Sequence, residues 1–189
     1  GVPSVPAPGR AGYNADVAGK TEQWQMSGHA DASGEPFRHW DEDGEVSASC
    51  AKCHTTPGFI DFVADGTVDG PAALGSVIEC TACHASANLF ADTSTRWDVV
   101  TPAGPLDDVL FPSGVTQDLG NNSNICATCH QGRSAGNLVD AATPNGTVQT
   151  PDYDSYNFIN RHYYAAAAIF FGSDVTAGYE YAGQTYVGQ

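Results

Sequence analysis

Positive charge is scarce in this chain. It carries seven lysines and arginines against 22 aspartates and glutamates, which gives a net charge of −15. Such an acidic surface is repelled by the phosphates of nucleic acids and by anionic lipid headgroups. The sequence also lacks an apolar run of the roughly 20 residues that a membrane-spanning helix needs. We therefore predict no nucleic-acid binding and no membrane span.

Long periodic segments and recognisable catalytic groupings are also missing. The 189 residues include 21 glycines and 11 prolines, which interrupt most candidate helices and strands. A core made only of protein side chains would be poor, so we expect mainly irregular backbone with short α-helices and a little β hairpin. No Ser-His-Asp grouping, phosphate-binding loop or pair of catalytic carboxylates is evident. We predict that the chain is not an enzyme.

What the chain does contain, three times, is the pattern Cys-x-x-Cys-His. The motifs comprise Cys50, Cys53 and His54; Cys80, Cys83 and His84; and Cys126, Cys129 and His130. This spacing is typical of c-type haem attachment. Two thiols three positions apart lie on one side of a helical turn, where they can form thioether bonds to the two vinyl groups of one porphyrin. The following histidine then binds the iron. We predict three haem c groups, around which the fold is organised.

Zinc binding is the main alternative for Cys-x-x-Cys pairs. Only six residues are histidine, so a chance histidine after all three pairs has odds on the order of 10⁻⁴ to 10⁻⁵. Two pairs would complete one Cys₄ zinc site and leave the third pair stranded. The three motifs use all six cysteines, so no thiol remains for a disulfide. Covalent haem is the better interpretation.

Three histidines lie outside the motifs: His29, His39 and His162. Three irons with one proximal imidazole each need three distal ligands, and the numbers match. Methionine as a distal ligand would raise the potential, but the only one, Met26, is expected to pack against a porphyrin. We predict bis-histidine ligation, with His162 on the third haem and His29 and His39 shared between the first two.

A lone histidine is more often a surface or hydrogen-bonded residue than a ligand. If one of the three free histidines were structural, one iron would keep an open face. The chain could then be a reductase or oxidase of small nitrogen or sulfur compounds. None of the three motifs departs from the common pattern, so electron transfer without substrate chemistry is preferred.

The domain organisation is expected to be simple. Residues 1–20, rich in proline, glycine and alanine, are predicted to form an extended arm, and residues 21–189 one trihaem domain. We expect a helix within residues 56–74, a helix over residues 162–171 closed by Gly172, and a hairpin over residues 179–187. The short gap between the first two motifs suggests that their haems form a close pair.

The cellular location follows from the chemistry of attachment. Haem is joined to such motifs outside the cytoplasm, and the chain begins at Gly1 rather than methionine. We expect an exported precursor and an extracellular or cell-surface location, with the periplasm as an alternative. The acidic clusters at residues 41–45 and 152–157 are predicted to be polar turns rather than calcium loops. Glycosylation patterns begin at Asn121 and Asn145.

Several segments resemble those of one group of proteins. The segments are Trp24-x-x-Ser27-Gly28-His29-Ala30, Phe37-x-His39-Trp40, Ser49–His54 and His162-Tyr163-Tyr164-Ala165-Ala166. Together they look like multihaem c-type cytochromes of extracellular electron transfer, some of which polymerise into filaments.

The resemblance implies a head-to-tail homo-oligomer that serves redox partner proteins or extracellular acceptors. In filament members a distal histidine can come from the next subunit, and His29 or His39 would be the candidates here. A discrete electron shuttle is the alternative.

Overall fold

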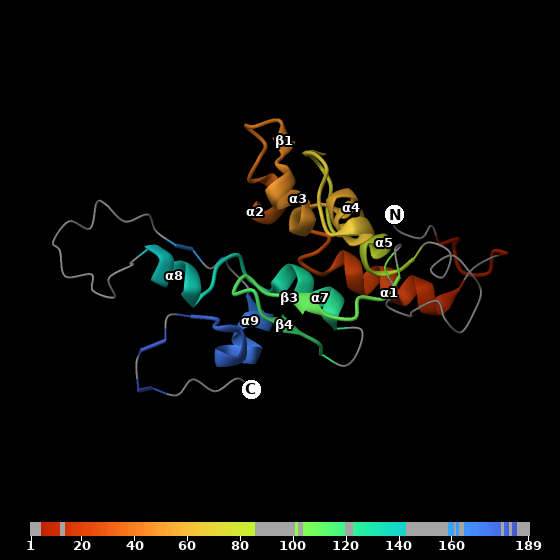
Figure 1. The fold of residues 1–189 in the computed structure, drawn as a ribbon. Coiled ribbons are helices and arrows are strands. Elements are labelled where there is room, and N and C mark those ends of the chain that lie inside the picture. The colour runs from red at the N-terminus through yellow and green to blue at the C-terminus, as the bar shows by residue number, and fades with distance from the viewer. Residues whose placement is uncertain are drawn as a thin grey trace. The chain divides into compact units, whose positions relative to one another are not determined.

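A computed structural model describes residues 5–11, 14–85, 101, 104–119, 123–142, 159–160, 162, 165–178, 180–181 and 183–184. Within these residues, short helices and two antiparallel two-stranded sheets are joined by irregular backbone (Figure 1). This agrees with the predicted short helices, irregular segments and small β content. The chain divides into two compact units, Gly1–Pro105 and Leu106–Gln189.

The first unit is built from short helices around one small sheet. Its elements are α1 (Ala15–Gln25), α2 (Glu35–Arg38), β1 (Glu45–Val46), α3 (Ala48–His54), α4 (Thr56–Asp65), β2 (Ala72–Ala73) and α5 (Cys80–Cys83). Strand β1 pairs with β2 in the register Glu45↔Ala73. Figure 1 shows α3, α4 and α5 in the orange-to-yellow part of the ribbon.

Helix α1 begins inside the segment predicted to be an extended arm. Its N-cap is Asn14, whose side chain accepts hydrogen bonds from the backbone N–H groups of Asp16 and Val17. This cap satisfies two of the N–H groups that a helix start leaves without a partner. Residues 15–20 are therefore helical rather than extended. The division into an arm and one domain stays a prediction.

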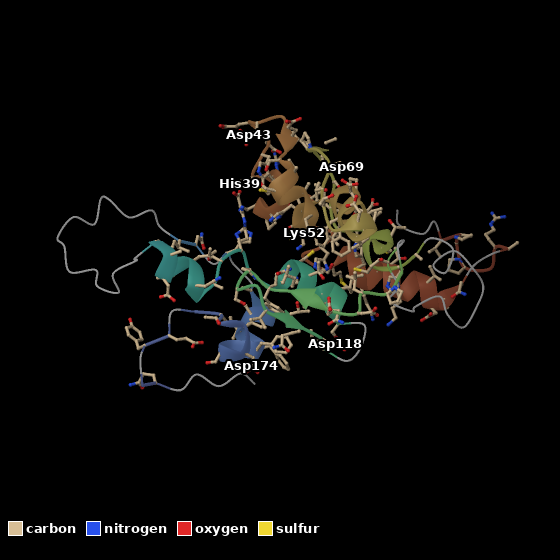
Figure 2. The ribbon with its side chains drawn as sticks, viewed as in Figure 1. His39, Asp43, Lys52, Asp69, Asp118 and Asp174 are labelled. Carbon is tan, nitrogen blue, oxygen red and sulfur yellow. The ribbon has the colours of Figure 1, made fainter. Side chains whose placement is uncertain are left out.

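The tightest packing in the first unit is between α3 and α4. Ala51, inside the first motif, is fully buried. A Cβ atom at Gly58 would lie 2.5 Å from the carbonyl carbon and oxygen of Ala51, so only glycine allows this approach. Thr55 caps α4, with its hydroxyl accepting from the Gly58 N–H and donating to the Ala51 carbonyl. Lys52 Nζ lies 4.0 Å from the centre of the Phe62 ring, a further link between the two helices (Figure 2).

The predicted helix within residues 56–74 is confirmed as α4. It ends at Gly66, which has a φ of 89° and closes the helix in the left-handed conformation. Residues 41–44 of the acidic segment 41–45 form a polar turn, as predicted, and Glu45 begins β1. The N–H groups of Asp43 and Gly44 both donate to the carbonyl of Trp40, and Gly44 has a φ of 83°.

The second unit has its own core. Its elements are β3 (Val109–Leu110), β4 (Thr116–Gln117), α7 (Asn124–His130), α8 (Gly136–Ala142), α9 (Ala166–Phe171) and the 3₁₀ helix η2 (Gly172–Val175). Buried side chains from these elements and the segments beside them form one cluster: Val109, Phe111, Ala127, Ala165, Ala168, Val175 and Ala177. Strands β3 and β4 form a hairpin with Val109 opposite Gln117. The third motif helix therefore packs on a small apolar core.

The helix predicted over residues 162–171 is shorter than expected. It begins at Ala166, and it ends at Gly172 as predicted. His162 has a φ of 78°, a left-handed conformation that no regular α-helix contains. The predicted hairpin at residues 179–187, the acidic cluster at 152–157 and both asparagines of the glycosylation patterns lie wholly or mainly outside the described residues. Among the described helices, none has both the length and the apolar character needed to cross a bilayer.

Candidate haem-attachment sites

All three Cys-x-x-Cys-His motifs lie on short helices. The first occupies α3, the second α5 and the residue after it, and the third α7. None of the six cysteines forms a disulfide. Cys126 is exposed and the other five are half-buried. Burial, aided by the neighbouring Glu79 carboxylate, raises the pKa of the Cys80 thiol. In each motif the two thiols are placed three residues apart on a helical turn, as thioether attachment requires.

The proximal histidine of the first motif is already oriented. The Nδ1 atom of His54 lies 2.8 Å from the backbone carbonyl oxygen of Pro36. Because a carbonyl only accepts hydrogen bonds, Nδ1 is the nitrogen that carries the hydrogen. Nε2 then keeps its lone pair, which is the state that binds a metal. The ring centres of His54 and Trp40 are 4.9 Å apart, which further limits rotation of the imidazole.

His39 is held in a similar way by a charged partner. Its Nδ1 atom lies 2.8 Å from the Glu35 carboxylate oxygen Oε1, one turn earlier. Its ring meets that of Trp40 edge-on, with the ring centres 5.0 Å apart. The His39 side chain, labelled in Figure 2, is 63% exposed. Trp40 thus contacts the rings of both His39 and His54.

The second motif is held in place by the first turn of α4. The Thr56 hydroxyl donates to the carbonyl of Val77 at 2.6 Å and accepts from the N–H of Glu79 at 2.8 Å. The N–H of Thr56 donates to the Ser76 hydroxyl at 3.1 Å. Helix α4 also contacts both α3 and α5. The chain just before Cys80 is therefore fixed by a residue that follows His54 by two positions.

Replacing Thr56 with valine is expected to destabilise the first unit by about 2 kcal/mol. Valine keeps the shape of threonine but leaves the Val77 carbonyl and the Glu79 N–H without this partner, and each lost partner costs about 1–3 kcal/mol when buried. Denaturant unfolding of the haem-loaded protein measures the change. Thr67→Val is the control, because Thr67 is exposed and bonds only to the nearby Asp65. Equal midpoints for the two variants would contradict the expectation.

His29 is tied to the second motif through its backbone. Its carbonyl accepts from the N–H of Ile78 at 3.1 Å, and the Trp24 indole donates to the Ile78 carbonyl at 2.8 Å. The loop around His29 borders an open hollow lined by Gln25, Met26, Ser27, Gly28, Ala30, Asp31, Ala32 and Ser33. Met26 is 81% exposed, and the prediction that it packs on a porphyrin stays a prediction.

The third motif is anchored by a buried amide at the start of its helix. Asn124 is 2% exposed, and its Nδ2 atom donates to the carbonyls of Leu106 and Asp107 and to the Asp118 carboxylate. Its Oδ1 atom accepts from the N–H of Leu119. The Asn124 side chain therefore links α7 to both segments that flank the β3–β4 hairpin.

His162 belongs to the same unit as the third motif. Its N–H donates to the Asn160 side chain at 2.8 Å, and the Asn160 carbonyl accepts from the Ser134 hydroxyl at 2.9 Å. Ser134 follows His130 by four residues. The histidine is half-buried, and these bonds tie its segment to the chain just after the third motif. Ligation of the third iron by His162 stays a prediction.

Four residues that hold the motifs in place were not predicted from the sequence: Glu35, Pro36, Thr56 and Asn124. Glu35 precedes His39 by four residues, a spacing that could have been recognised on a helix. Thr56 and Asn124 begin helices at or beside motifs, but their bonding partners are distant in sequence. The Pro36 carbonyl has no sequence signal at all.

These residues fit covalently bound haem better than zinc. A Cys₄ site would bring two of the cysteine pairs together. In the part of the chain that the structure describes, no group of three or more histidine, cysteine or acidic side chains is placed to hold a metal ion. The cysteine pairs on helical turns and the orientation of the His54 ring match what haem c needs.

These features are like those of multihaem c-type cytochromes. Two curated relatives, both from Geobacter sulfurreducens, carry that description. C-type polyheme cytochrome OmcB is 27% identical over 173 residues, which cover 79% of this chain and 22% of the relative. C-type polyheme cytochrome OmcC is 26% identical over 195 residues, which cover 89% of this chain and 24% of the relative.

Both relatives are described as polyheme c-type cytochromes, in keeping with the three Cys-x-x-Cys-His motifs of this chain. The chain spans only about a quarter of the length of these relatives. No protein-family model and no solved structure matches it.

Proposed function

We propose that this chain transfers electrons through three covalently bound haems, each with two histidine ligands. The observation that carries the proposal is that all three motifs place a pair of cysteines on a helical turn. The orientation of His54 supports it, because the Pro36 carbonyl engages Nδ1 and Nε2 is the nitrogen that would bind iron. The six histidines equal the ligands that three six-coordinate irons need.

In this function the protein holds the haems, orients their histidine ligands and tunes their reduction potentials. Haem supplies the reversible one-electron couple when it is bound. The motif cysteines fix the porphyrins, and His54, His84 and His130 provide the proximal nitrogens. His29 and His39 serve the first two haems, in keeping with their contacts in the first unit, and His162 serves the third. Two imidazoles per iron leave no position for a substrate, so the chain does not act as an enzyme.

Intact mass and optical spectra of the purified protein test this proposal together. We expect a mass increase of three haem groups and low-spin spectra in both oxidation states, because every iron has two nitrogen ligands. A high-spin band that shifts on adding cyanide or nitrite would contradict bis-histidine ligation and favour the reductase alternative. A protein without covalent haem would overturn the proposal completely.

We further propose that copies of the chain assemble head to tail into an extracellular filament that passes electrons to redox proteins or extracellular acceptors. A heterologous interface whose rotation does not close generates an open filament. Exposed apolar side chains in the second unit, Leu110, Ile169, Phe170 and Tyr181, support contacts between copies. Electron microscopy at high protein concentration tests this, and discrete particles alone would favour the shuttle alternative.

An extracellular or cell-surface location is part of the same proposal. Covalent haem attachment to Cys-x-x-Cys-His motifs takes place outside the cytoplasm, so the polypeptide has to be exported first. Cell fractionation with an antibody against the chain tests this, with surface or medium fractions expected and the cytoplasmic fraction contradicting it.

A further inference from the structure

The four-residue helix α2 holds two imidazole rings at once. The Glu35 carboxylate bonds His39 Nδ1, and the next residue, Pro36, bonds His54 Nδ1 through its carbonyl, both at 2.8 Å. Trp40, two residues after the helix ends, contacts both rings. In both histidines Nδ1 is therefore the donor, which makes Nε2 the nitrogen that would bind a metal.

The two partners differ in charge, and this difference matters for an iron ligand. A carbonyl oxygen carries only a partial negative charge, whereas a carboxylate carries a full one and forms the stronger, charge-assisted hydrogen bond. A carboxylate bonded to Nδ1–H increases the basicity of the ligating nitrogen on the other side of the ring. A more basic ligand and a nearby negative charge both stabilise Fe(III) relative to Fe(II).

The neighbouring cation does not compete for Glu35 in this arrangement. Arg38, at the end of α2, directs its guanidinium to Asp41, with Nε 2.7 Å from the carboxylate oxygen. The Glu35 carboxylate in turn bonds His39. The helix thus separates its charges into one ion pair and one carboxylate–imidazole pair.

We propose that Glu35 is a positioning residue that holds His39 with Nε2 toward iron and lowers the reduction potential of the haem that His39 binds. This inference rests on the proposed function, because it takes His39 as a distal ligand. It adds a specific role for a residue outside the motifs and identifies one of the three haems as tuned by a carboxylate.

Glu35→Gln is the direct test, because glutamine keeps the length and an acceptor oxygen but removes the charge. We expect the reduction potential of one haem to rise by about 59 mV. For a one-electron couple this is a tenfold change in the ratio of oxidised to reduced haem. Spectroelectrochemical titration of the haem-loaded protein measures the three potentials. The low-spin spectrum should remain, since His39 still binds.

Glu45→Gln is the matched control, because Glu45 is an exposed carboxylate of the same unit, on β1. It removes the same charge from the surface without touching a histidine. A potential shift confined to Glu35→Gln supports the inference. Equal shifts in the two variants, or no shift in either, overturn it.

His39→Ala separates this inference from the proposed function. If His39→Ala creates a high-spin haem while Glu35→Gln leaves every potential unchanged, ligation by His39 stands and the tuning role of Glu35 is wrong. If His39→Ala leaves all haems low-spin, His39 is not a ligand, and both the inference and this part of the proposed ligand set fail.

Discussion

Replacing Gly58 with alanine is expected to destabilise the first unit by about 3 kcal/mol. The added Cβ would lie 2.5 Å from both the carbonyl carbon and the carbonyl oxygen of Ala51, and 2.7 Å from the Ala51 Cβ. The two carbonyl atoms belong to the backbone of the first motif helix, so no flexible side chain can move aside. Overpacking of this kind typically costs about 1–3 kcal/mol, and we expect the upper end of this range because the contacts with Ala51 would be so short. Helices α3 and α4 would have to separate.

Separation of α3 and α4 is also expected to disturb the second haem site, because α4 carries Thr56, the residue that fixes the chain before Cys80. Guanidinium unfolding of the haem-loaded protein, followed by the haem absorption band, measures the change. Gly19→Ala is the matched control, since Gly19 lies inside helix α1 with open space around it. Alanine there should stabilise the protein by about 0.5–1 kcal/mol. Midpoints that move in the same direction for both variants would contradict this account of the packing.

Sequence patterns could predict the chemistry of the motifs because that chemistry is local. Each motif has its two cysteines and its histidine within five residues, and a helical turn is enough to place them. Helix α4 was predictable for the same reason, because Phe59, Ile60, Phe62 and Val63 form an apolar run before the terminating Gly66. The start of α1 also had a local signal, the Asn14 cap, although the proline and glycine content around it favoured an extended arm.

The support around the motifs could not be predicted, because it depends on contacts between distant residues. Gly58 gives no sign in the sequence that it touches Ala51, and Asn124 gives none that it binds Leu106 and Asp118. The orientation of His54 depends on a backbone carbonyl 18 residues earlier. His162 was expected to open a helix, but its backbone adopts a left-handed conformation held by Asn160. Such features follow from the tertiary fold and not from spacing.

Removing one haem is expected to have different consequences in the two units. Cys50→Ala with Cys53→Ala should abolish attachment of the first haem and also lower occupancy of the second. The physical reason is the chain of contacts from α3 through α4 to the segment before Cys80, which depends on a well-ordered α3. Mass spectrometry of haem-bearing peptides, with a separate yield for each motif, measures both effects.

Cys126→Ala with Cys129→Ala is the matched variant in the second unit. The third motif packs on the core around Val109, Phe111 and Ala168, and its anchor, Asn124, bonds residues of that unit alone. We therefore expect full loading of the first two haems and loss of the third only. In each double variant, the occupancy of the two haems whose motifs are unchanged would be compared with that in the original protein. An equal loss of occupancy in both variants would mean that the contacts made by α4 do not couple the first two sites. Coupling through α4 predicts the asymmetry, because α4 contacts the helices of both the first and the second motif.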